Sequence, residues 1–383
     1  MSLIETIKNL ITISPESSIS FYQFMELALY HPTYGYYCRN EEKVGKGGDF
    51  YTNASVGSVF GEILAGVFTE MGECIASENP IHLIEFGGGN GTLMKQVLSE
   101  WKHHYPNSMN QLKVVMIDRS SYHRSRQMQT LSDYDVIWAE SLEEYSAAIE
   151  GSIQGIVFSN ELIDAFPVHL VERRSGQWWE VCVGWDETAN AFIERLRLLE
   201  NKEILNFLQI EEASIPSMEG YRLEVNLDGV KWLENVAKRI QDGYIVTIDY
   251  GYERQELYIS ERCKGSIMCY KNHQAFENPL IGPGEMDITS HVNFSSLIEE
   301  GRKQGIDSLG LFSQSEFLIN GGILDRLMEH QETDPFAGMM SKKNRAIRQL
   351  IMPGGMGSTF KVLVQAKGNC SRDLTKLQKR SWI

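Results

Sequence analysis

The stretch IHLIEFGGGNGTL, residues 81–93, decides the fold of this chain. Its apolar run ends in glycines, and the residues after it have the 3.6-residue spacing of an amphipathic helix. Apolar runs that end in polar residues recur at VVMIDRS (114–120), DVIWAES (135–141) and GIVFSNELIDAF (155–166), with a predicted helix near 122–131. This alternation with short loops predicts a parallel sheet, whose ligands bind beyond the carboxyl ends of the strands.

Two segments interrupt the alternation. Residues 168–230 contain a predicted hairpin and a helix, and residues 252–290 are rich in loops. The wound pattern resumes with a helix at 230–241 and a strand at 243–251, and it ends with a strand at 359–367. We therefore expect about seven strands in one sheet, two insertions, and a mostly helical N-terminal segment ahead of the sheet.

Composition limits the classes of function. The chain has 383 residues, with 51 acidic against 36 basic side chains and a formal net charge of −15. Nucleic acid is a poor partner, because phosphate binding needs a basic surface. The sequence has no run of 18 uncharged apolar residues, so no membrane span is expected. Six scattered cysteines and the lack of a signal or transit peptide predict a cytoplasmic protein with reduced thiols.

The glycine spacing after the first strand selects a cofactor. Glycines recur at Gly87, Gly89 and Gly91, two residues after the acidic Glu85. A pyrophosphate-binding loop would need its third glycine at Thr92, so the dinucleotide fingerprint fails. The pattern suits S-adenosylmethionine, which has no pyrophosphate and can lie against a backbone that lacks Cβ atoms.

The ends of the next two strands extend the same site. Asp118 follows its strand 27 residues after Gly91, and its carboxylate can accept both ribose hydroxyls. Glu140 and Ser141 follow the third strand, at the position from which a methyltransferase contacts adenine. An N-cap by Ser141 for the next helix is an alternative interpretation, and so is a solvated strand-end acid for Asp118.

The loop after the fourth strand is expected beside the transferred methyl group. It reads SNELIDAFP (159–167) and lacks the Asn/Asp-Pro-Pro-aromatic run of enzymes that methylate planar amines. Instead it carries Glu161 and Asp164, which would share a face on one helical turn. Paired carboxylates match the donor fork of a guanidinium and can relay its proton. Asn160 is counted among the cofactor contacts, and a structural role for either acid stays open.

Two further groups of acids give weaker indications. Asp49 follows two glycines and could close over the cofactor, or it could be an ordinary loop acid. Glu285, Asp287 and His291 cluster in sequence, but they lack the helical histidine spacing of metalloproteases, so no metal is predicted.

Taken together, these motifs make the chain resemble the MidA-like class I methyltransferases, whose mitochondrial members are arginine methyltransferases needed to assemble respiratory complex I. The resemblance covers about residues 30–365. The matching segments are HPTYGYY (31–37), GKGGDFYT (45–52), VFGE (59–62), EFGGGNGTLM (85–94), SNELIDAFP (159–167), IDYGY (248–252), PGEMDITSHVNFSSL (283–297), SQSEFLINGGI (313–323) and PGGMGSTFKVLV (353–364).

The resemblance implies an α/β fold, namely a Rossmann-like seven-stranded class I methyltransferase sheet with a helical N-terminal cap and two insertions. The implied domains are a helical cap or lid at 1–75 and a methyltransferase domain at 76–383, with insertions at about 168–230 and 252–290. It also implies cofactor contacts at Asp118 and the glycines, with Asp49 and Glu161 near the site. The chain departs from the family at Gly88, where proline is usual, and at 53–56, where an acid is missing.

The leading hypothesis from the sequence is therefore an S-adenosylmethionine-dependent methyltransferase that acts on arginine in a protein substrate. One alternative is a non-enzymatic assembly factor that retains the fold, because the insertions offer docking surface. Another is a small-molecule methyltransferase whose N-terminal helices close over a pocket. A nicotinamide dehydrogenase is disfavoured by the glycine spacing. The sequence leaves the acceptor protein and the oligomeric state open.

Overall fold

The computed structural model describes residues 2–39, 56–75, 80–149, 151–327, 339–352 and 356–378. Contacts divide the chain into two units, each assembled from three segments. Unit 1 takes residues 1–50, 163–232 and 251–297, and unit 2 takes 51–162, 233–250 and 298–383. The predicted scheme of a cap at 1–75 and one methyltransferase domain after it stays a prediction.

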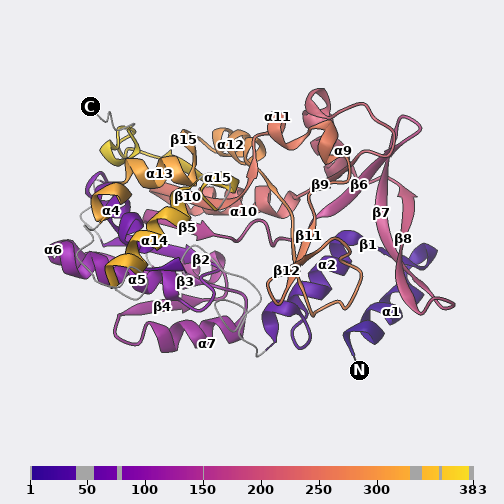
Figure 1. Cartoon of the computed structure of the whole chain (residues 1–383), viewed down its shortest axis with the longest axis horizontal. Helices are drawn as coiled ribbons and strands as arrows, with labels where there is room; N and C mark the ends of the chain where they lie inside the picture. The colour runs from indigo at the N-terminus through magenta and orange to yellow at the C-terminus, as the bar shows by residue number, and fades with distance from the viewer. Residues whose placement is uncertain are drawn as a thin grey trace. The chain divides into compact units, whose positions relative to one another are not determined.

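Unit 2 is built on a mixed sheet with strand order β15-β16-β10-β5-β2-β3-β4 among the described residues (Figure 1). Strands β4, β3, β2, β5 and β10 are parallel, whereas β16 is antiparallel to both β10 and β15. The strands are β2 (Ile81–Phe86), β3 (Leu112–Ile117), β4 (Val136–Ala139), β5 (Ile153–Asn160), β10 (Ile240–Tyr252), β15 (Ile306–Ser313) and β16 (Phe360–Lys367). The predicted α/β class is confirmed, and the glycine loop leaves β2 at the carboxyl edge of the parallel strands.

Helices flank this sheet, and most of them bury apolar side chains in a common core. The described helices of unit 2 include α4 (Val59–Glu73), α5 (Thr92–His104), α7 (Ser121–Thr130), α8 (Leu142–Ala147), α13 (Gln314–Asn320) and α14 (Met339–Ile351). Helix α4 packs on α5 and β5, and its Phe68 ring lies 4.9 Å from that of Phe158 on β5. The core that they share also buries Trp101, Phe317 and Phe360, so it holds the strand ends in fixed positions.

Unit 1 contains an antiparallel sheet of order β1-β7-β6-β9, with β8 paired to β7. Its strands are β1 (Ser18–Ser20), β6 (His169–Arg174), β7 (Gln177–Asp186), β8 (Ala191–Leu198) and β9 (Arg222–Val225). Helices α1 (Leu3–Ile13) and α2 (Phe21–Tyr30) contact β7, and they bury Ile7 and Phe24 completely. A small sheet, β12-β11-β13, follows in the segment that the sequence indicated as loop (β11 Met268–Lys271, β12 Gln274–Phe276, β13 Asp287–Thr289).

Three further helices lie in unit 1 or where the chain passes between the units. Helix α9 (Lys202–Glu211) lies in unit 1, while α10 (Leu227–Arg239) and α12 (Phe294–Lys303) each continue from one unit into the other along the chain. The two-residue strand β14 (Val292–Asn293) pairs in parallel with the last two residues of β10. Within the described residues, no helix combines the length and the apolar character needed to cross a bilayer.

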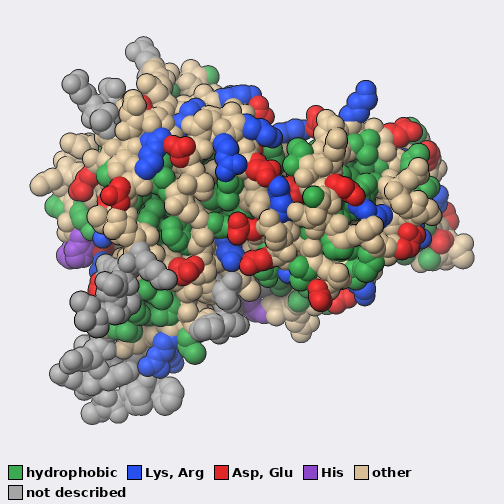
Figure 2. Space-filling view, turned by 90° about the horizontal axis from the view of Figure 1, so that it is seen from above, with side chains coloured by type: hydrophobic (Ala, Val, Ile, Leu, Met, Phe, Trp, Pro, Cys, Tyr) green, Lys and Arg blue, Asp and Glu red, His purple; other side chains and the backbone are tan. Residues whose placement is uncertain are grey.

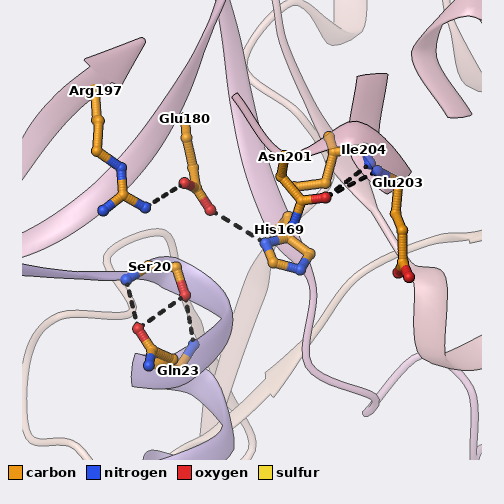
Figure 3. Close-up of polar contacts among 8 residues, drawn as sticks. All are labelled: Ser20, Gln23, His169, Glu180, Arg197, Asn201, Glu203 and Ile204. Atoms are coloured by element: carbon orange, nitrogen blue, oxygen red, sulfur yellow. Dashed lines mark hydrogen bonds and ion pairs between the residues drawn. The ribbon is translucent and has the colours of Figure 1, made fainter. Parts of the chain in front are cut away.

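Polar contacts fix the helix starts and the strand ladder of unit 1 (Figure 3). Ser20 and Gln23 form a capping box, in which the Ser20 hydroxyl accepts from the Gln23 amide and Gln23 Oε1 accepts from the Ser20 amide. Across the sheet, the Glu180 carboxylate lies between His169 Nδ1, at 3.2 Å, and Arg197 Nη2, at 2.6 Å. The side chain of Glu180 is buried, so this pairing satisfies a charge that would otherwise be costly.

Charged side chains of both signs are mixed on the surface. Figure 2 shows Lys and Arg side chains interspersed with Asp and Glu over the face that it displays, rather than gathered into one region of a single sign. A field that would steer one charged partner needs such a region. Charge on this face therefore points to no particular macromolecule.

Candidate functional site

The backbone of the glycine loop has conformations that are unfavourable for residues with a side chain. Gly87, Gly89 and Gly91 have φ values of 64°, 51° and 81°, in the left-handed region where a Cβ is unfavourable. A Cβ on Gly87 would lie 2.7 Å from Leu162 Cδ1, whereas a Cβ on Gly89 would meet no atom within 4 Å. Gly89 therefore presents bare, open backbone at the carboxyl end of β2.

Gly88, where the family usually has proline, is enclosed on its side-chain face. A Cβ there would come within 2.3 Å of Met116 Cε and 3.0 Å of Glu85 Cδ. The carboxyl group of Glu85 thus lies beneath the loop, and its Oε2 is buried without a hydrogen-bond partner. Burial, and then the charge of Asp118, raise the pKa of Glu85 to about 8. Glu85 is consequently a neutral acid near pH 7.

Asp118 is held in place by two N–H donors. Its Oδ1 accepts from the Ser120 amide at 2.9 Å and its Oδ2 accepts from Gln127 Nε2 at 3.0 Å. His123 Nδ1 lies 3.6 Å from Oδ2. Gln127 Nε2 also donates to the Gly89 carbonyl at 3.1 Å, so one carboxamide connects the carboxylate with the glycine loop.

The sequence analysis missed Gln127, which is completely buried on α7. The residues around it, SYHRSRQMQT, are almost all polar, so no apolar stripe marks the buried face of this helix. In such a helix, the sequence does not show which side is buried, so a buried polar residue cannot be recognised before the structure is known.

Glu140 and Ser141 follow β4 as predicted. The Ser141 hydroxyl accepts from the Glu144 amide at 3.1 Å and caps α8, which is the alternative role that the sequence left open. The Glu140 carboxylate is exposed and lies 3.7 Å from Arg124 Nη2, while Arg124 Nη1 donates to the Asp118 carbonyl at 2.6 Å. Contact with adenine stays a prediction for both residues.

The loop after β5 is strained and firmly held. Glu161 has φ 55°, a left-handed conformation that costs a residue with a side chain about 1 kcal/mol or more. Its amide donates to the Ile248 carbonyl at 2.9 Å, and the next amide, of Leu162, donates to Asp249 Oδ2 at 3.2 Å. Asn160 Nδ2 donates to Glu161 Oε1 at 3.0 Å, and Asn160 Oδ1 is buried without a partner. These contacts fix the Glu161 carboxylate at the end of β5.

Residues 161–166 form bends and turns, not a helix. The expectation that Glu161 and Asp164 share a helical face is therefore wrong, because the left-handed Glu161 cannot begin a right-handed turn. The two acids also fall in different units, since unit 2 ends this segment at Leu162.

Asp164 is buried in unit 1 among tyrosines and a second acid. Its carbonyl accepts from the Ser290 amide at 2.9 Å, and the neighbouring Ala165 carbonyl accepts from the Tyr30 hydroxyl, also at 2.9 Å. Burial raises the pKa of Tyr37 well above its usual value, and the charges of Asp287 and Asp164 raise it further. Tyr37 thus stays a neutral phenol, and its hydroxyl donates to Asp287 Oδ1 at 2.6 Å.

The other candidate acids either have a local partner or lie outside the described residues. Asp49 lies outside the described residues. Glu285 pairs with Lys271 Nζ at 2.8 Å and Asp287 binds Tyr37, so each has a local partner. In the part of the chain that the structure describes, no group of three or more His, Cys, Asp or Glu side chains could hold a metal ion.

The residues around the glycine loop fit the predicted cofactor. Gly89 offers open backbone, Asp118 offers acceptors, and the buried oxygens Glu85 Oε2 and Asn160 Oδ1 have no partner of their own. A ligand with a ribose, an ammonium group and a carboxylate can use both bare backbone and such acceptors. The acceptor of the methyl group is not determined by these contacts.

Comparison with known proteins agrees with this chemistry. A family model described as "S-adenosyl-L-methionine-dependent methyltransferase" matches residues 59–312. The chain is also similar to the crystal structure of a Burkholderia thailandensis protein bound to S-adenosyl-homocysteine. The TM-score is 0.85 and the identity 30%, over 99% of this chain and 95% of that one.

Curated relatives carry a more specific name. The protein arginine methyltransferase NDUFAF7 homolog, mitochondrial, of Drosophila melanogaster is 25% identical over 92% of this chain and 83% of its own length. Protein arginine methyltransferase NDUFAF7, mitochondrial, of Danio rerio is 26% identical over 89% and 82%.

These names correct one expectation. The cytoplasmic localisation inferred from the sequence is contradicted, because the relatives are named as mitochondrial proteins. That inference rested on the lack of a recognisable leader, which does not determine a compartment. The MidA label does not occur in these names and stays a prediction.

Proposed function

Because this chain belongs to the family of S-adenosyl-L-methionine-dependent methyltransferases, we propose that it methylates arginine side chains of a protein substrate. The chain is an enzyme, and S-adenosylmethionine is its cofactor. One observation carries the arginine assignment: relatives that align with about nine-tenths of the chain are named protein arginine methyltransferases.

Apart from Asp49, which lies outside the described residues, the residues proposed to hold the cofactor lie at the carboxyl ends of β2 to β5. Open backbone at Gly89 accommodates the cofactor, and the Asp118 carboxylate accepts the ribose hydroxyls. When bound, S-adenosylmethionine supplies an electrophilic methyl group on a sulfonium. The full proposed set comprises Asp49, Glu85, Gly87, Gly89, Gly91, Asp118, Glu140, Ser141 and Asn160.

The residues proposed to act on the acceptor are Glu161 and Asp164. A carboxylate can pair with the planar guanidinium through two parallel hydrogen bonds and align one nitrogen for attack. Either acid can then take up the proton that the nitrogen loses. The contact from Asn160 and the strained backbone keep the Glu161 carboxylate from rotating away.

The surroundings of Asp164 support a cationic acceptor. Burial is the main reason why the pKa values of Tyr37 and Tyr270 in unit 1 are raised, and the charge of Asp164 adds to both shifts. Asp287 contributes to the same shifts, so two acids and two neutral phenols lie within electrostatic range of one another. A guanidinium, which keeps its charge when it is desolvated, is suited to such surroundings better than a neutral acceptor.

Two measurements test the proposal in sequence. Calorimetric titration with S-adenosylhomocysteine should give binding for the wild type and a loss of about tenfold or more for Asp118→Ala, since hydrogen bonds to a charged group contribute about 1.5–3 kcal/mol. Mass spectrometry of peptides from cells with and without the gene should then find methyl groups on arginine. Glu161→Gln and Asp164→Asn should keep cofactor binding and lose this modification.

The remaining hypotheses correspond to other outcomes of the same experiments. Methylation of a small molecule with no change in peptides would contradict a protein substrate. A cellular phenotype that survives Glu161→Gln and Asp164→Asn, with cofactor binding intact, would favour the non-enzymatic assembly factor. A wild type that does not bind S-adenosylhomocysteine would contradict the assignment of the cofactor-binding residues.

A further inference from the structure

Gln127 occupies a position that packing alone does not explain. It is the buried residue of α7, and its Cα lies 3.2 Å from the point that a Cβ on Gly91 would occupy. Its carboxamide nitrogen donates to the Gly89 carbonyl and to Asp118 Oδ2, while its Oε1 is buried without a partner. A leucine would fill the same space and would leave no oxygen unsatisfied. A buried polar atom without a hydrogen bond costs about 1–3 kcal/mol.

The two donated hydrogen bonds join the two parts of the cofactor site. The Gly89 carbonyl belongs to the loop after β2, and Asp118 follows β3. An amide NH₂ has two donors in a fixed plane, so using both determines how the carboxylate is rotated relative to the loop. The hydrogen bond from Arg124 goes to the backbone carbonyl of Asp118 and so does not orient its carboxylate.

A count of lone pairs shows what this orientation leaves available. A carboxylate has about four acceptor sites, two on each oxygen. The Ser120 amide takes one on Oδ1 and Gln127 takes one on Oδ2. His123 Nδ1 also lies near Oδ2, at 3.6 Å, which is beyond hydrogen-bond distance. The two hydrogen bonds therefore leave one acceptor site on each oxygen for the two hydroxyl donors of a ribose.

We propose that Gln127 is a positioning residue for cofactor binding, which acts through Asp118 by turning its carboxylate so that both oxygens face the two ribose hydroxyls. The proposal rests on the cofactor assignment made under the proposed function. It adds a specific requirement, because affinity gained from the hydroxyls should depend on Gln127 as well as on Asp118.

The test compares two ligands by calorimetric titration of the full chain. One is S-adenosylhomocysteine and the other is its 2′,3′-dideoxy analogue, which lacks both hydroxyls. The wild type should bind the first ligand about tenfold or more tightly than the second. Gln127→Met keeps the length of the side chain and removes its donors, so it should abolish most of this ratio while changing the affinity for the dideoxy ligand less than about threefold.

The control is Gln129→Met on the same helix, where the side chain is exposed and should leave both affinities unchanged. If Gln127→Met proves unstable, Gln127→Leu serves instead, because leucine has no donor for Asp118 and should also abolish the ratio. An equal loss for both ligands, or a ratio that is retained, would overturn the proposal. A wild type with no preference for the hydroxyls would instead contradict the role of Asp118.

Discussion

At the scale of the residue, the neutral state of Glu85 is the feature with the clearest consequence. Its folded-state pKa of about 8 exceeds the ordinary value of 4.5, mainly because the group is buried. The native state therefore binds more protons than the unfolded chain between these two pH values. Stability from this group is complete below about 4.5 and is lost as the pH rises towards 8.

Glu85→Gln should remove this dependence. The free energy of unfolding, measured by denaturant titration from pH 5 to 9, should fall less steeply for the variant than for the wild type, because glutamine has no proton to lose. Glu73→Gln, at an exposed position on α4, serves as the control and should reproduce the wild-type slope. Parallel curves for Glu85→Gln and the wild type would mean that Glu85 is ionised in the folded state.

Two glycines allow backbone strain to be separated from ligand contact. Gly89 and Gly176 both have positive φ, at 51° and 75°, and a Cβ on either would meet nothing within 4 Å. Alanine at each position should reduce stability by a similar amount, about 1–2 kcal/mol, because both are left-handed. Only Gly89→Ala should weaken binding of S-adenosylhomocysteine in calorimetry. Equal binding by the two variants would exclude close approach of the cofactor at Gly89.

At the scale of the element, Glu180 on β7 links three strands of unit 1, and its ionisation affects the stability of the protein at low pH. Burial would raise the pKa of Glu180, but hydrogen bonds from His169 on β6 and Arg197 on β8 lower it below its ordinary value. Its stabilising contribution is thus present above about pH 4.5 and is lost as the pH falls through the lower folded-state value.

Glu180→Gln should therefore destabilise the protein most near neutral pH, by about 1.5–3 kcal/mol for the loss of hydrogen bonds to a charged group, since the Arg197 side chain that remains is 36% exposed. Thermal unfolding at pH 7 and at pH 4 should show the difference from the wild type shrinking in acid. Glu187→Gln offers a matched comparison, because that side chain is exposed, 3.7 Å from Lys8, and should change stability by less than about 1 kcal/mol. A deficit for Glu180→Gln that is constant with pH would contradict the charge pairing.

At the scale of the whole molecule, the chain passes between the units at 50/51, 162/163, 232/233, 250/251 and 297/298. The first segment is part of the core of unit 1, where Ile7 and Phe24 are completely buried with Val183 of β7. Helices α1 and α2 are thus integral to unit 1, although they precede the segment that carries β7 by more than a hundred residues.

Deleting residues 2–30 should therefore prevent soluble expression, since it uncovers the apolar face of β7. Fractionation of lysates checks this expectation. Within the same helix, Ile7→Ser should also be insoluble or strongly destabilised, whereas Ile4→Ser, at a side chain that is 41% exposed, should remain soluble. A soluble deletion variant that still binds S-adenosylhomocysteine would show that helices α1 and α2 are dispensable for folding and for cofactor binding.

The sequence was sufficient for the parallel strands and their order of appearance, because each combines a buried apolar run with a distinct polar or glycine end. It was insufficient where local signals are short or contradictory. The strands β11 to β13 have three or four residues each and show no sustained alternation. Residues 315–330 have the spacing of one helix, but helix α13 ends at Asn320, because Gly322 takes φ 95° and the chain continues as a 3-10 turn at Ile323–Arg326.

The site shows the same division. The glycine loop and Asp118 could be predicted as parts of the site, because closely spaced glycines and an acid after an apolar strand can be recognised in a single sequence. The left-handed Glu161 could not, because the contacts that hold it come from Ile248 and Asp249, almost ninety residues away. Gln127 was missed for a related reason, as its buried face depends on the loop and carboxylate that it joins.

The five passages between the units also affect synthesis on the ribosome. Unit 1 cannot be completed before residue 297 has emerged, and unit 2 requires β16, which ends at Lys367. Neither unit is complete in an early portion of the nascent chain, and the buried cluster that holds Phe24 also includes Ile288, so it cannot form in full until most of the chain has been made. Expression of this protein should consequently depend on chaperones that bind emerging chains, and slow elongation would prolong that delay.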